Sequence, residues 1–239
     1  MLGLKAARAL KRAPDDISEG PVRIRIGEPK DARAWINLRE RSRDHLTRWE
    51  PDWRADEITL EAVRSRLKKA SRRRRKPSHL SLFIFRKTDQ ALVGGMTLSS
   101  IRFHVACSAQ VGYWIGSDHV GNGYAKAALR AAARYCFDYL ELNRLEAACQ
   151  PGNIASQRVL TGVGFHEEGF ARDYLFINGA WRDHCLFALT ARDAKALGLS
   201  RKERPERISM LDSVGRRSPP DQPVSDPAGV GVADPEQVM

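Results

Sequence analysis

A glycine turn that leads directly from a strand into a helix is the feature that most restricts how this chain can fold. Residues 109–115 read as a strand, and residues 123–140 are rich in alanine, with apolar residues mostly three or four positions apart, as in a core-facing helix. Glycines at 121 and 123 allow a ligand to approach the backbone closely. Because the first amides of a helix lack partners and carry its positive dipole end, this turn suits a phosphate or pyrophosphate.

The turn does not match the two best-known phosphate-binding motifs. It lacks the GK[ST] ending of a P-loop, and the dinucleotide fingerprint would need a third glycine where Lys126 stands. These differences disfavour nucleotide hydrolysis and dinucleotide redox chemistry. A glycine pair also occurs in ordinary tight turns, so the turn alone does not identify a ligand.

The rest of the pattern predicts an α+β, or mixed α/β, domain. Alternating residues, turn signals and an Asn-Gly hairpin signal at 178–179 define the strands, and a proline in the Trp49–Arg54 loop separates the first two helices. We expect strands over 22–26, 80–85, 92–98, 109–115, 144–149, 170–177 and 181–189, and helices over about 30–47, 59–74, 123–140 and 153–165.

These elements define one domain over residues 22–192, with a basic, flexible segment over 1–21 and a disordered tail over 193–239. The tail is predicted because the last stretch has few large apolar residues and much Pro, Asp, Arg, Gly and Ser. No apolar run reaches about 18 residues, and the N-terminal apolar stretch is too short for a secretory signal. We therefore expect a cytoplasmic protein without membrane contact, whose four cysteines are reduced.

The chain carries a formal net charge of +11, and much of it is local. Arg64–Lys76 holds nine cations and no acid. Such a run can contact the phosphate backbone of RNA, or it can simply be a solvated helix end and loop. Both interpretations stay open.

The glycine turn resembles the acetyl-CoA loop of the GNAT acetyltransferases, which reads Gln/Arg-x-x-Gly-x-Gly/Ala. Here Val120 replaces the leading Gln or Arg, which removes one side-chain contact from a site that the family builds chiefly from backbone amides. Asn153, Ser156 and Gly164-Phe165 match a second signature of the family. The resemblance implies cofactor contacts at Tyr113, Trp114, Ile115, Val120, Gly121, Asn122, Gly123, Tyr124, Ala125, Asn153 and Ser156.

The resemblance narrows to the RimJ-like ribosomal-protein-alanine N-acetyltransferases. It implies the GNAT fold: a central mixed, mostly antiparallel sheet with helices on both faces and a splayed strand pair that holds acetyl-CoA. It also implies transfer to a protein N-terminal α-amine, of a ribosomal protein that starts with Ala or Ser, without a metal. Four stretches carry it: Trp49-Glu-Pro51, Gly112-Tyr-Trp-Ile-Gly116, Asn153-Ile-Ala-Ser156 and Asp173-Tyr-Leu-Phe-Ile-Asn-Gly-Ala-Trp-Arg-Asp-His184.

Direct transfer from a thioester to an amine needs a neutral amine, a stabilised oxyanion and a proton for the leaving thiolate. Many relatives supply that proton from a Tyr seven residues after the Asn, but Leu160 stands there, so we assign the role to Ser156. We expect Trp49 and Glu50 to line the acceptor side. Asp173 is our candidate base, and the other carboxylates that remain open are Glu50, Glu168 and Asp183. A water chain without a strong base also remains open, because an N-terminal α-amine has an unperturbed pKa of about 7.7 to 8.0.

Two other functions remain open. The acceptor can be a small amine such as a polyamine, an aminoglycoside or a free amino acid, because one fold hosts many substrates. Alternatively, a catalytically weak GNAT domain binds the ribosome or RNA through Arg64–Lys76. The sequence does not indicate an oligomeric state.

Overall fold

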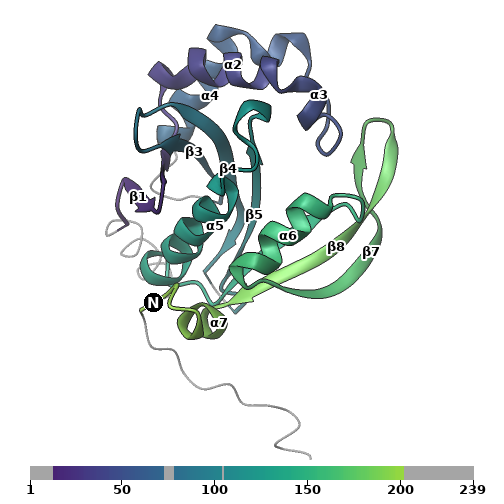
Figure 1. Cartoon of the computed structure of the whole chain (residues 1–239). Coiled ribbons are helices and arrows are strands. Elements are labelled where there is room, and N and C mark those ends of the chain that lie inside the picture. Colours follow the sequence, from purple (N-terminus) through teal and green to yellow (C-terminus); the bar gives the residue numbers. More distant parts are fainter. Residues whose placement is uncertain (1–12, 73–77, 104, 202–239) are drawn as a thin grey trace, which may run out of the picture. The chain divides into compact units, whose positions relative to one another are not determined.

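A computed structural model describes residues 13–72, 78–103 and 105–201, all within one compact unit (Figure 1). Eight strands of these residues form one sheet in the order β1-β2-β3-β4-β5-β6-β8-β7. Neighbouring strands are antiparallel except for β5 and β6, which are parallel. The strands are β1 (Asp16–Glu19), β2 (Val22–Ile26), β3 (Leu80–Arg86), β4 (Leu92–Arg102), β5 (Ser108–Ile115), β6 (Arg144–Cys149), β7 (His166–Ile177) and β8 (Ala180–Thr190).

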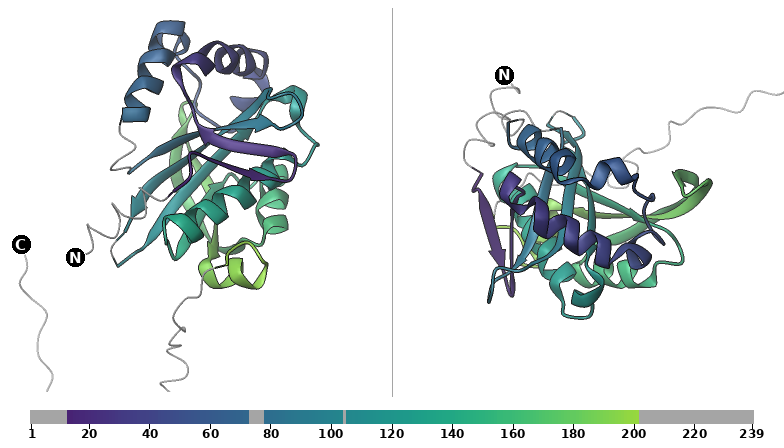
Figure 2. Two further views of the ribbon diagram at one scale, coloured as in Figure 1. Left: turned by 90° about the vertical axis from the view of Figure 1, so that its left-hand side faces the viewer. Right: turned by 90° about the horizontal axis from the view of Figure 1, so that it is seen from above.

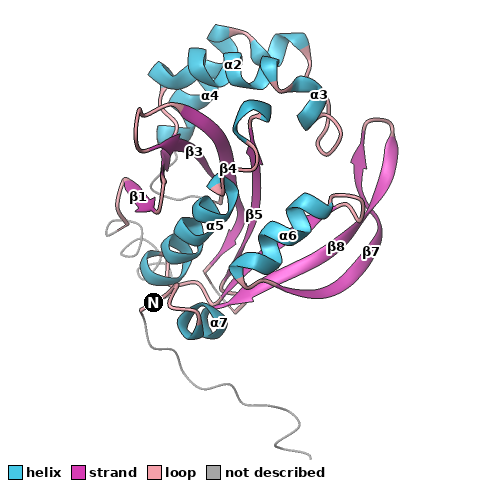
Figure 3. Ribbon diagram, viewed as in Figure 1, coloured by secondary structure: helices cyan, strands magenta, loops and turns pink. Residues whose placement is uncertain are grey.

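Helices cover both faces of this sheet, as Figures 2 and 3 show. A π-helical turn at Tyr135–Tyr139 extends α5. No helix within the described ranges is long and apolar enough to cross a membrane. The α-helices are α2 (Ala32–Arg41), α3 (Arg43–Leu46), α4 (Leu60–Arg72), α5 (Tyr124–Arg134), α6 (Ile154–Val163) and α7 (Ala191–Ala196), and the short 3-10 turns are Pro29–Asp31, Ala55–Ile58 and Ser117–His119.

The alternation of side chains along β3 explains the two layers. Leu82 and Ile84 belong to the larger hydrophobic core, on the α5 side of the sheet. Phe83 and Phe85 belong to a second core with residues of α2 and α4. Because successive side chains of a strand point to opposite faces, each face needs its own helical cover. The predicted fold class, with helices on both faces of a mostly antiparallel sheet, is confirmed.

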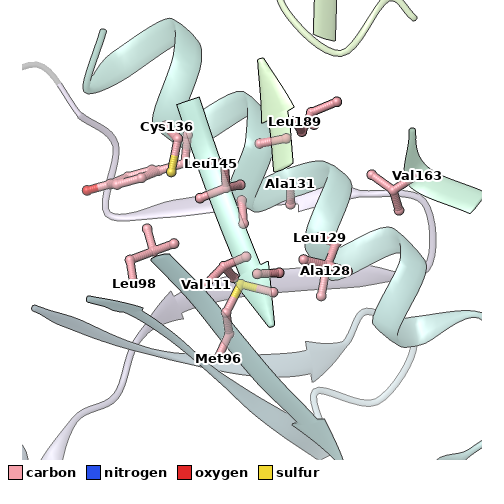
Figure 4. Packing of buried hydrophobic residues seen from close by; sticks show 14 of the residues in the cluster. Met96, Leu98, Val111, Ala128, Leu129, Ala131, Cys136, Leu145, Val163 and Leu189 are labelled. Carbon is pink, nitrogen blue, oxygen red and sulfur yellow. The ribbon is translucent and has the colours of Figure 1, made fainter. Parts of the chain in front are cut away.

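Small side chains let α5 lie close to the sheet (Figure 4). Ala128 and Ala131 are fully buried and belong to the same core cluster as Met96 and Val111 of the central strands. Leu129, which is also fully buried, contributes about 1.5–3 kcal/mol by its removal from water. This packing fixes the N-terminus of α5 just beyond the end of β5.

The domain starts earlier than predicted. Within the segment predicted to be flexible, β1 pairs with β2, and Glu19 forms ion pairs with Arg130 and Arg134 at 3.0 and 2.9 Å. The strand was missed because it has only four residues before the turn at Gly20-Pro21. Residues 1–12 lie outside the described residues.

The domain also ends later than predicted. Thr190 caps α7 by accepting a hydrogen bond from the N–H of Asp193, and Ala194 and Leu199 are fully buried. The first residues of the predicted disordered tail are therefore part of the core. The prediction for residues 202–239 lies outside the described residues.

The predicted helix at 30–47 is broken at Ser42, which separates α2 from α3. Ser42 is buried, and its hydroxyl oxygen accepts a hydrogen bond from the N–H of Ser117 at 3.0 Å. The break therefore ties the helical layer to the segment that follows β5. The predicted helix at 59–74 ends as α4 at Arg72, and residues 73–77 lie outside the described residues.

Candidate active site

Strands β5 and β6 separate after three paired positions. In these two strands, which the structure describes in full, the register runs from Ser108↔Arg144 to Gln110↔Glu146 and then stops. Farther along, β5 stays paired with β4 as far as Ile115, and β6 stays paired with β8 as far as Cys149. We call the open angle between residues 111–115 and 147–149 the splay. Its strand edges can accept an extended ligand as an added strand does.

The glycine turn forms an open cradle at the start of α5. Gly121 and Gly123 have φ angles of +79° and +73°, and a Cβ atom added to either would meet nothing within 4 Å. Gly123 is the N-cap residue and has no side chain to cap the helix. Asn122 holds the turn, because its Nδ2 donates to the carbonyls of His119 and Val120 at 3.2 and 3.0 Å. No side chain caps the first turn of α5, and the space beside both glycines is open, so an anion can bind there.

The remaining predicted cradle residues differ in exposure. Val120 is 50% exposed, whereas the side chain of Tyr124 is buried in the core. Tyr124 can therefore serve a ligand only through its backbone. Burial, with a smaller effect of Arg86, lowers the pKa of His119, which favours the neutral imidazole beside the turn.

Tyr113 bridges the splay from β5 to α6. Its hydroxyl lies 2.9 Å from the hydroxyl oxygen of Ser156 and 3.3 Å from the Ser156 carbonyl oxygen. Asn153 caps α6, and its Oδ1 accepts a hydrogen bond from the N–H of Ser156 at 3.1 Å. Burial raises the pKa of Tyr113 to about 12, so the phenol keeps its proton at neutral pH. Leu160, where relatives have a Tyr, is fully buried.

Cys149, at the end of β6, lies beside this pair of hydroxyls. Burial raises its pKa to about 11, while an interaction with Ser156 opposes the shift. The thiol is therefore protonated at neutral pH and is a poor nucleophile. This agrees with the sequence interpretation of a reduced, structural thiol.

Trp114 points to the opposite face from Tyr113. Its indole covers Gly95 of β4, where an added Cβ would lie 2.6 Å from the indole Nε1. The ring also meets Trp35 of α2 edge-on, with 6.5 Å between the ring centroids. Trp114 thus connects the splay with the helical layer of α2 and α4, and Ile115 packs into the larger core.

Arg39 of α2, which the sequence analysis missed, lies at the centre of a tryptophan cluster. Its guanidinium carbon lies 3.9, 4.8 and 5.2 Å from the ring centroids of Trp53, Trp114 and Trp35. Its Nη2 is 2.8 Å from Oε1 of Glu50. Burial lowers the pKa of Arg39 and raises that of Glu50, and the attraction between the two opposes both shifts. The only feature of the sequence that could have indicated a buried Arg39 is its position beside Leu38 on an apolar helix face.

The Trp49–Trp53 loop, which carries Glu50, is fixed from two sides. The tip of the β7–β8 hairpin supplies Asn178, whose Oδ1 accepts from the N–H of Asp52 at 2.8 Å and whose Nδ2 donates to the carbonyl of Thr47 at 2.7 Å. Gln150, next to the end of β6, donates to the carbonyl of Trp49 at 3.5 Å. Figure 1 shows the hairpin tip curving toward the segment after α3. Trp49 and Glu50 thus lie near the wide end of the splay.

The other three candidate carboxylates, Glu168, Asp173 and Asp183, form no hydrogen bond or ion pair with the Tyr113–Ser156 pair among the described residues. Glu168 binds Arg144 at the start of β6, and this pairing lowers the pKa of Glu168. Asp173 is exposed, with a φ angle of +48°, and its N–H donates to Oδ1 of Asp183 at 2.9 Å. No contact in the described part of the chain joins Asp173 to Tyr113 or Ser156, and its catalytic role stays a prediction.

Comparison with known proteins places this geometry in a family. The family model described as "Acetyltransferase (GNAT) domain" matches residues 22–166. The chain is 32% identical over 173 residues to an Escherichia coli protein named [Ribosomal protein uS5]-alanine N-acetyltransferase, with 71% of this chain and 88% of that protein covered.

Two solved structures are similar as well. A Mycobacterium smegmatis RimJ in complex with CoA-disulfide is 32% identical, with a TM-score of 0.70, and the match covers 78% of this chain and 96% of that one. The ribosomal-protein-S5-alanine acetyltransferase of Vibrio fischeri is 29% identical, also with a TM-score of 0.70, over 74% of this chain and 97% of that one.

Proposed function

The chain belongs to the GNAT N-acetyltransferases, and on that premise we propose that it transfers the acetyl group of acetyl-CoA to the N-terminal α-amine of a protein. The proposed acceptor is a ribosomal protein that starts with Ala or Ser, in the cytoplasm. The Escherichia coli and Vibrio fischeri relatives, which are named as alanine N-acetyltransferases of a ribosomal protein, support this acceptor.

The donor fits the cradle and the splay. The pyrophosphate of CoA would lie on the amides of Gly121, Gly123 and the first turn of α5, since anions bind free helix N-termini. The pantetheine arm would run along the open edge of Tyr113–Ile115 and pass the cap residue Asn153. Acetyl-CoA, once bound, supplies an activated thioester.

The residues in the splay suit direct transfer. The Ser156 hydroxyl would protonate the leaving thiolate and recover a proton from Tyr113, because the two hydroxyls share a hydrogen bond. Open backbone N–H groups along residues 111–115 would stabilise the oxyanion of the tetrahedral intermediate. No covalent enzyme intermediate is needed.

The observation that carries the proposal is the uncapped glycine cradle beside the splay. Acetyl-CoA consumption measured with peptides that differ in their first residue tests it, with polyamines and aminoglycosides as competing acceptors. We expect turnover with peptides starting with Ala or Ser. Turnover with a small amine alone would keep the family and replace the acceptor, and the absence of turnover with every acceptor would contradict the proposal.

A contact with ribosomal RNA is a second element of the proposal. In α4, the side chains of Arg64 and Lys69 are exposed, while Val63 and Leu67 face the core. Phosphate contacts weaken as salt rises, because bound counterions are released. We expect the double variant Arg64→Glu, Lys69→Glu to bind the ribosome more weakly and with a smaller dependence on salt. Its turnover of peptides should persist. Unchanged association would contradict the RNA contact.

A further inference from the structure

We propose that Glu50 takes the proton from the acceptor amine and that Arg39 is the positioning residue that holds Glu50 in place. This inference rests on the proposed function, because it names the base for the same transfer. The sequence leaves four carboxylates open as the base, with Asp173 as the candidate. The contacts around Glu50 distinguish it from the other three.

Glu50 lies where three parts of the fold meet. Its backbone carbonyl accepts a hydrogen bond from Nδ2 of Asn178, at the hairpin tip, at 3.3 Å. Its neighbour Trp49 contacts the connection between β6 and α6, where a Cβ added to Gly152 would lie 3.8 Å from the Trp49 ring. Arg39, which binds the Glu50 carboxylate, contacts the ring of Trp114 in β5. These contacts put Glu50 among the hairpin tip, the β6–α6 connection and Trp114 of β5, which border the wide end of the splay.

The side chains of Arg39 and Glu50 differ in their exposure to solvent. The Arg39 side chain is 8% exposed and the Glu50 side chain 28% exposed. The arginine is therefore an internal support, whereas the Glu50 side chain is partly exposed. Its Oε1, the oxygen nearest to Arg39, is buried, so an acceptor must reach the carboxylate through Oε2. A carboxylate held in this way can accept a proton without first being ordered by the substrate.

The planar guanidinium explains why the support is an arginine. Three indole rings surround it, and its two Nη atoms contact the two carboxylate oxygens of Glu50, at 2.8 and 3.3 Å. A lysine has neither the plane nor the fork that these contacts use. The Nε of Arg39 is buried and has no hydrogen-bond partner among the described residues, so the pair tolerates little change around it.

The proton balance of the step is complete. The amine nitrogen attacks the acetyl carbonyl carbon, the new C–N bond forms, and the C–S bond breaks. The nitrogen loses one proton to Glu50, and the thiolate gains one from the Ser156–Tyr113 pair. Solvent restores both groups, and no oxidant or reductant takes part.

Charged groups around Glu50 come from three helices. Arg39 of α2 binds it directly. Arg43 of α3 lies over Trp53 at 4.8 Å and pairs with Asp52, and Arg66 of α4 lies over Trp35 at 5.1 Å. Burial raises the pKa of Glu50 and the charge of Arg39 opposes that shift, so loss of the charge must raise this pKa further.

The test compares the pH dependence of kcat in Glu50→Gln, Arg39→Met and Arg39→Lys with that of the wild-type protein. We follow kcat because the free α-amine has a pKa of about 7.7 to 8.0 and dominates the pH dependence of kcat/KM. Asp44→Asn is the matched control, since Asp44 is an exposed carboxylate of α3 outside this cluster.

We expect Glu50→Gln to lower kcat by roughly 10²-fold, the usual contribution of a general base. The same variant should also lose the acidic limb of the plot of kcat against pH. Arg39→Met should move that limb upward by about one pH unit, because an opposite charge is lost. Arg39→Lys should restore the position of the limb and not the full kcat. The KM for acetyl-CoA should stay constant throughout, as should all parameters of Asp44→Asn.

An unchanged acidic limb in both Glu50→Gln and Arg39→Met would overturn the inference, provided that the wild-type protein turns over. Loss of the limb in Asp173→Asn instead would assign the base to Asp173 and also overturn it. Failure of the proposed function is separate, because it appears in the wild-type protein as turnover with no amine. If Arg39→Met does not fold, Glu50→Gln, which preserves the shape of the side chain, still decides.

Discussion

The cradle depends on two glycines, because their backbone conformation and the open space beside them both favour glycine over any other residue. Gly121 and Gly123 have positive φ angles and face open space. Only glycine adopts such angles without cost, and a larger residue would also place carbon atoms where the phosphate groups are proposed to lie. A substitution in the turn should therefore lower both the stability of the fold and the affinity for CoA. The two effects can be separated by making the same substitution at a glycine with a similar φ angle that lies outside the turn.

Gly198 is that match, because its φ is +67° and an added Cβ also meets nothing within 4 Å. We expect Gly123→Ala and Gly198→Ala each to lower the free energy of unfolding by about 1–2 kcal/mol. Only Gly123→Ala should weaken CoA binding, by about tenfold in calorimetric titration. Equal CoA affinity in the two variants would show that the turn does not bind the donor.

The hydroxyl pair across the splay leads to a second prediction at this scale. Tyr113→Phe and Ser156→Ala should each lower kcat by roughly 10²-fold, since each interrupts proton delivery to the thiolate. The double variant should be little worse than either single one, because residues that act as a unit are not additive. Fully additive losses in steady-state kinetics would argue against a shared proton path.

At the scale of elements, β4 and β5 depend on a close approach. Gly95 lies beneath the indole of Trp114, where a methyl group has no space. We expect Gly95→Ala to cost about 1–3 kcal/mol in denaturant unfolding, as overpacking does. In a Trp114→Ala background the same substitution should cost much less, and an equal cost in both backgrounds would contradict the contact.

The tip of the β7–β8 hairpin holds the loop that carries Glu50 through hydrogen bonds of Asn178. Asn178→Gly keeps the left-handed conformation, at a φ of +50°, and removes the hydrogen bonds to Asp52 and Thr47. We expect a higher KM for the acceptor and an unchanged KM for acetyl-CoA. Gln90→Gly is the control, because Gln90 also has a positive φ in another hairpin turn and bonds Arg23 of β2 and Lys87 of that turn. Equal effects of the two variants would contradict the role of the tip.

Local patterns were sufficient for most of the elements. The glycine turn before α5, the Asn153 cap of α6 and the Asn-Gly hairpin are signals carried by a few adjacent residues. The four-residue β1 and the six-residue α7 were missed because such short segments show hardly one period of their pattern. The break at Ser42 depends on a bond to Ser117, 75 residues away, and no local pattern reports it.

At the scale of the whole molecule, the site is assembled from segments far apart in the chain. The turn and the splay could be anticipated from the sequence, through the resemblance to known acetyltransferases. The support of Glu50 could not, because Asn178 reaches the loop across 131 residues and Arg39 is recognised only by its burial among tryptophans from three segments. These contacts are the basis of our proposal that Glu50, and not Asp173, is the base.

The central claim is that this fold acetylates an N-terminal α-amine, with the donor on one side of the splay and the acceptor on the other. The most direct measurement is the position of the acetyl group, found by fragment mass spectrometry, in a peptide that starts with Ala and also contains an internal lysine. The account predicts acetyl on the α-amine alone and no product from the same peptide with a blocked N-terminus. Acetyl on the lysine, or equal product from the blocked peptide, would contradict it.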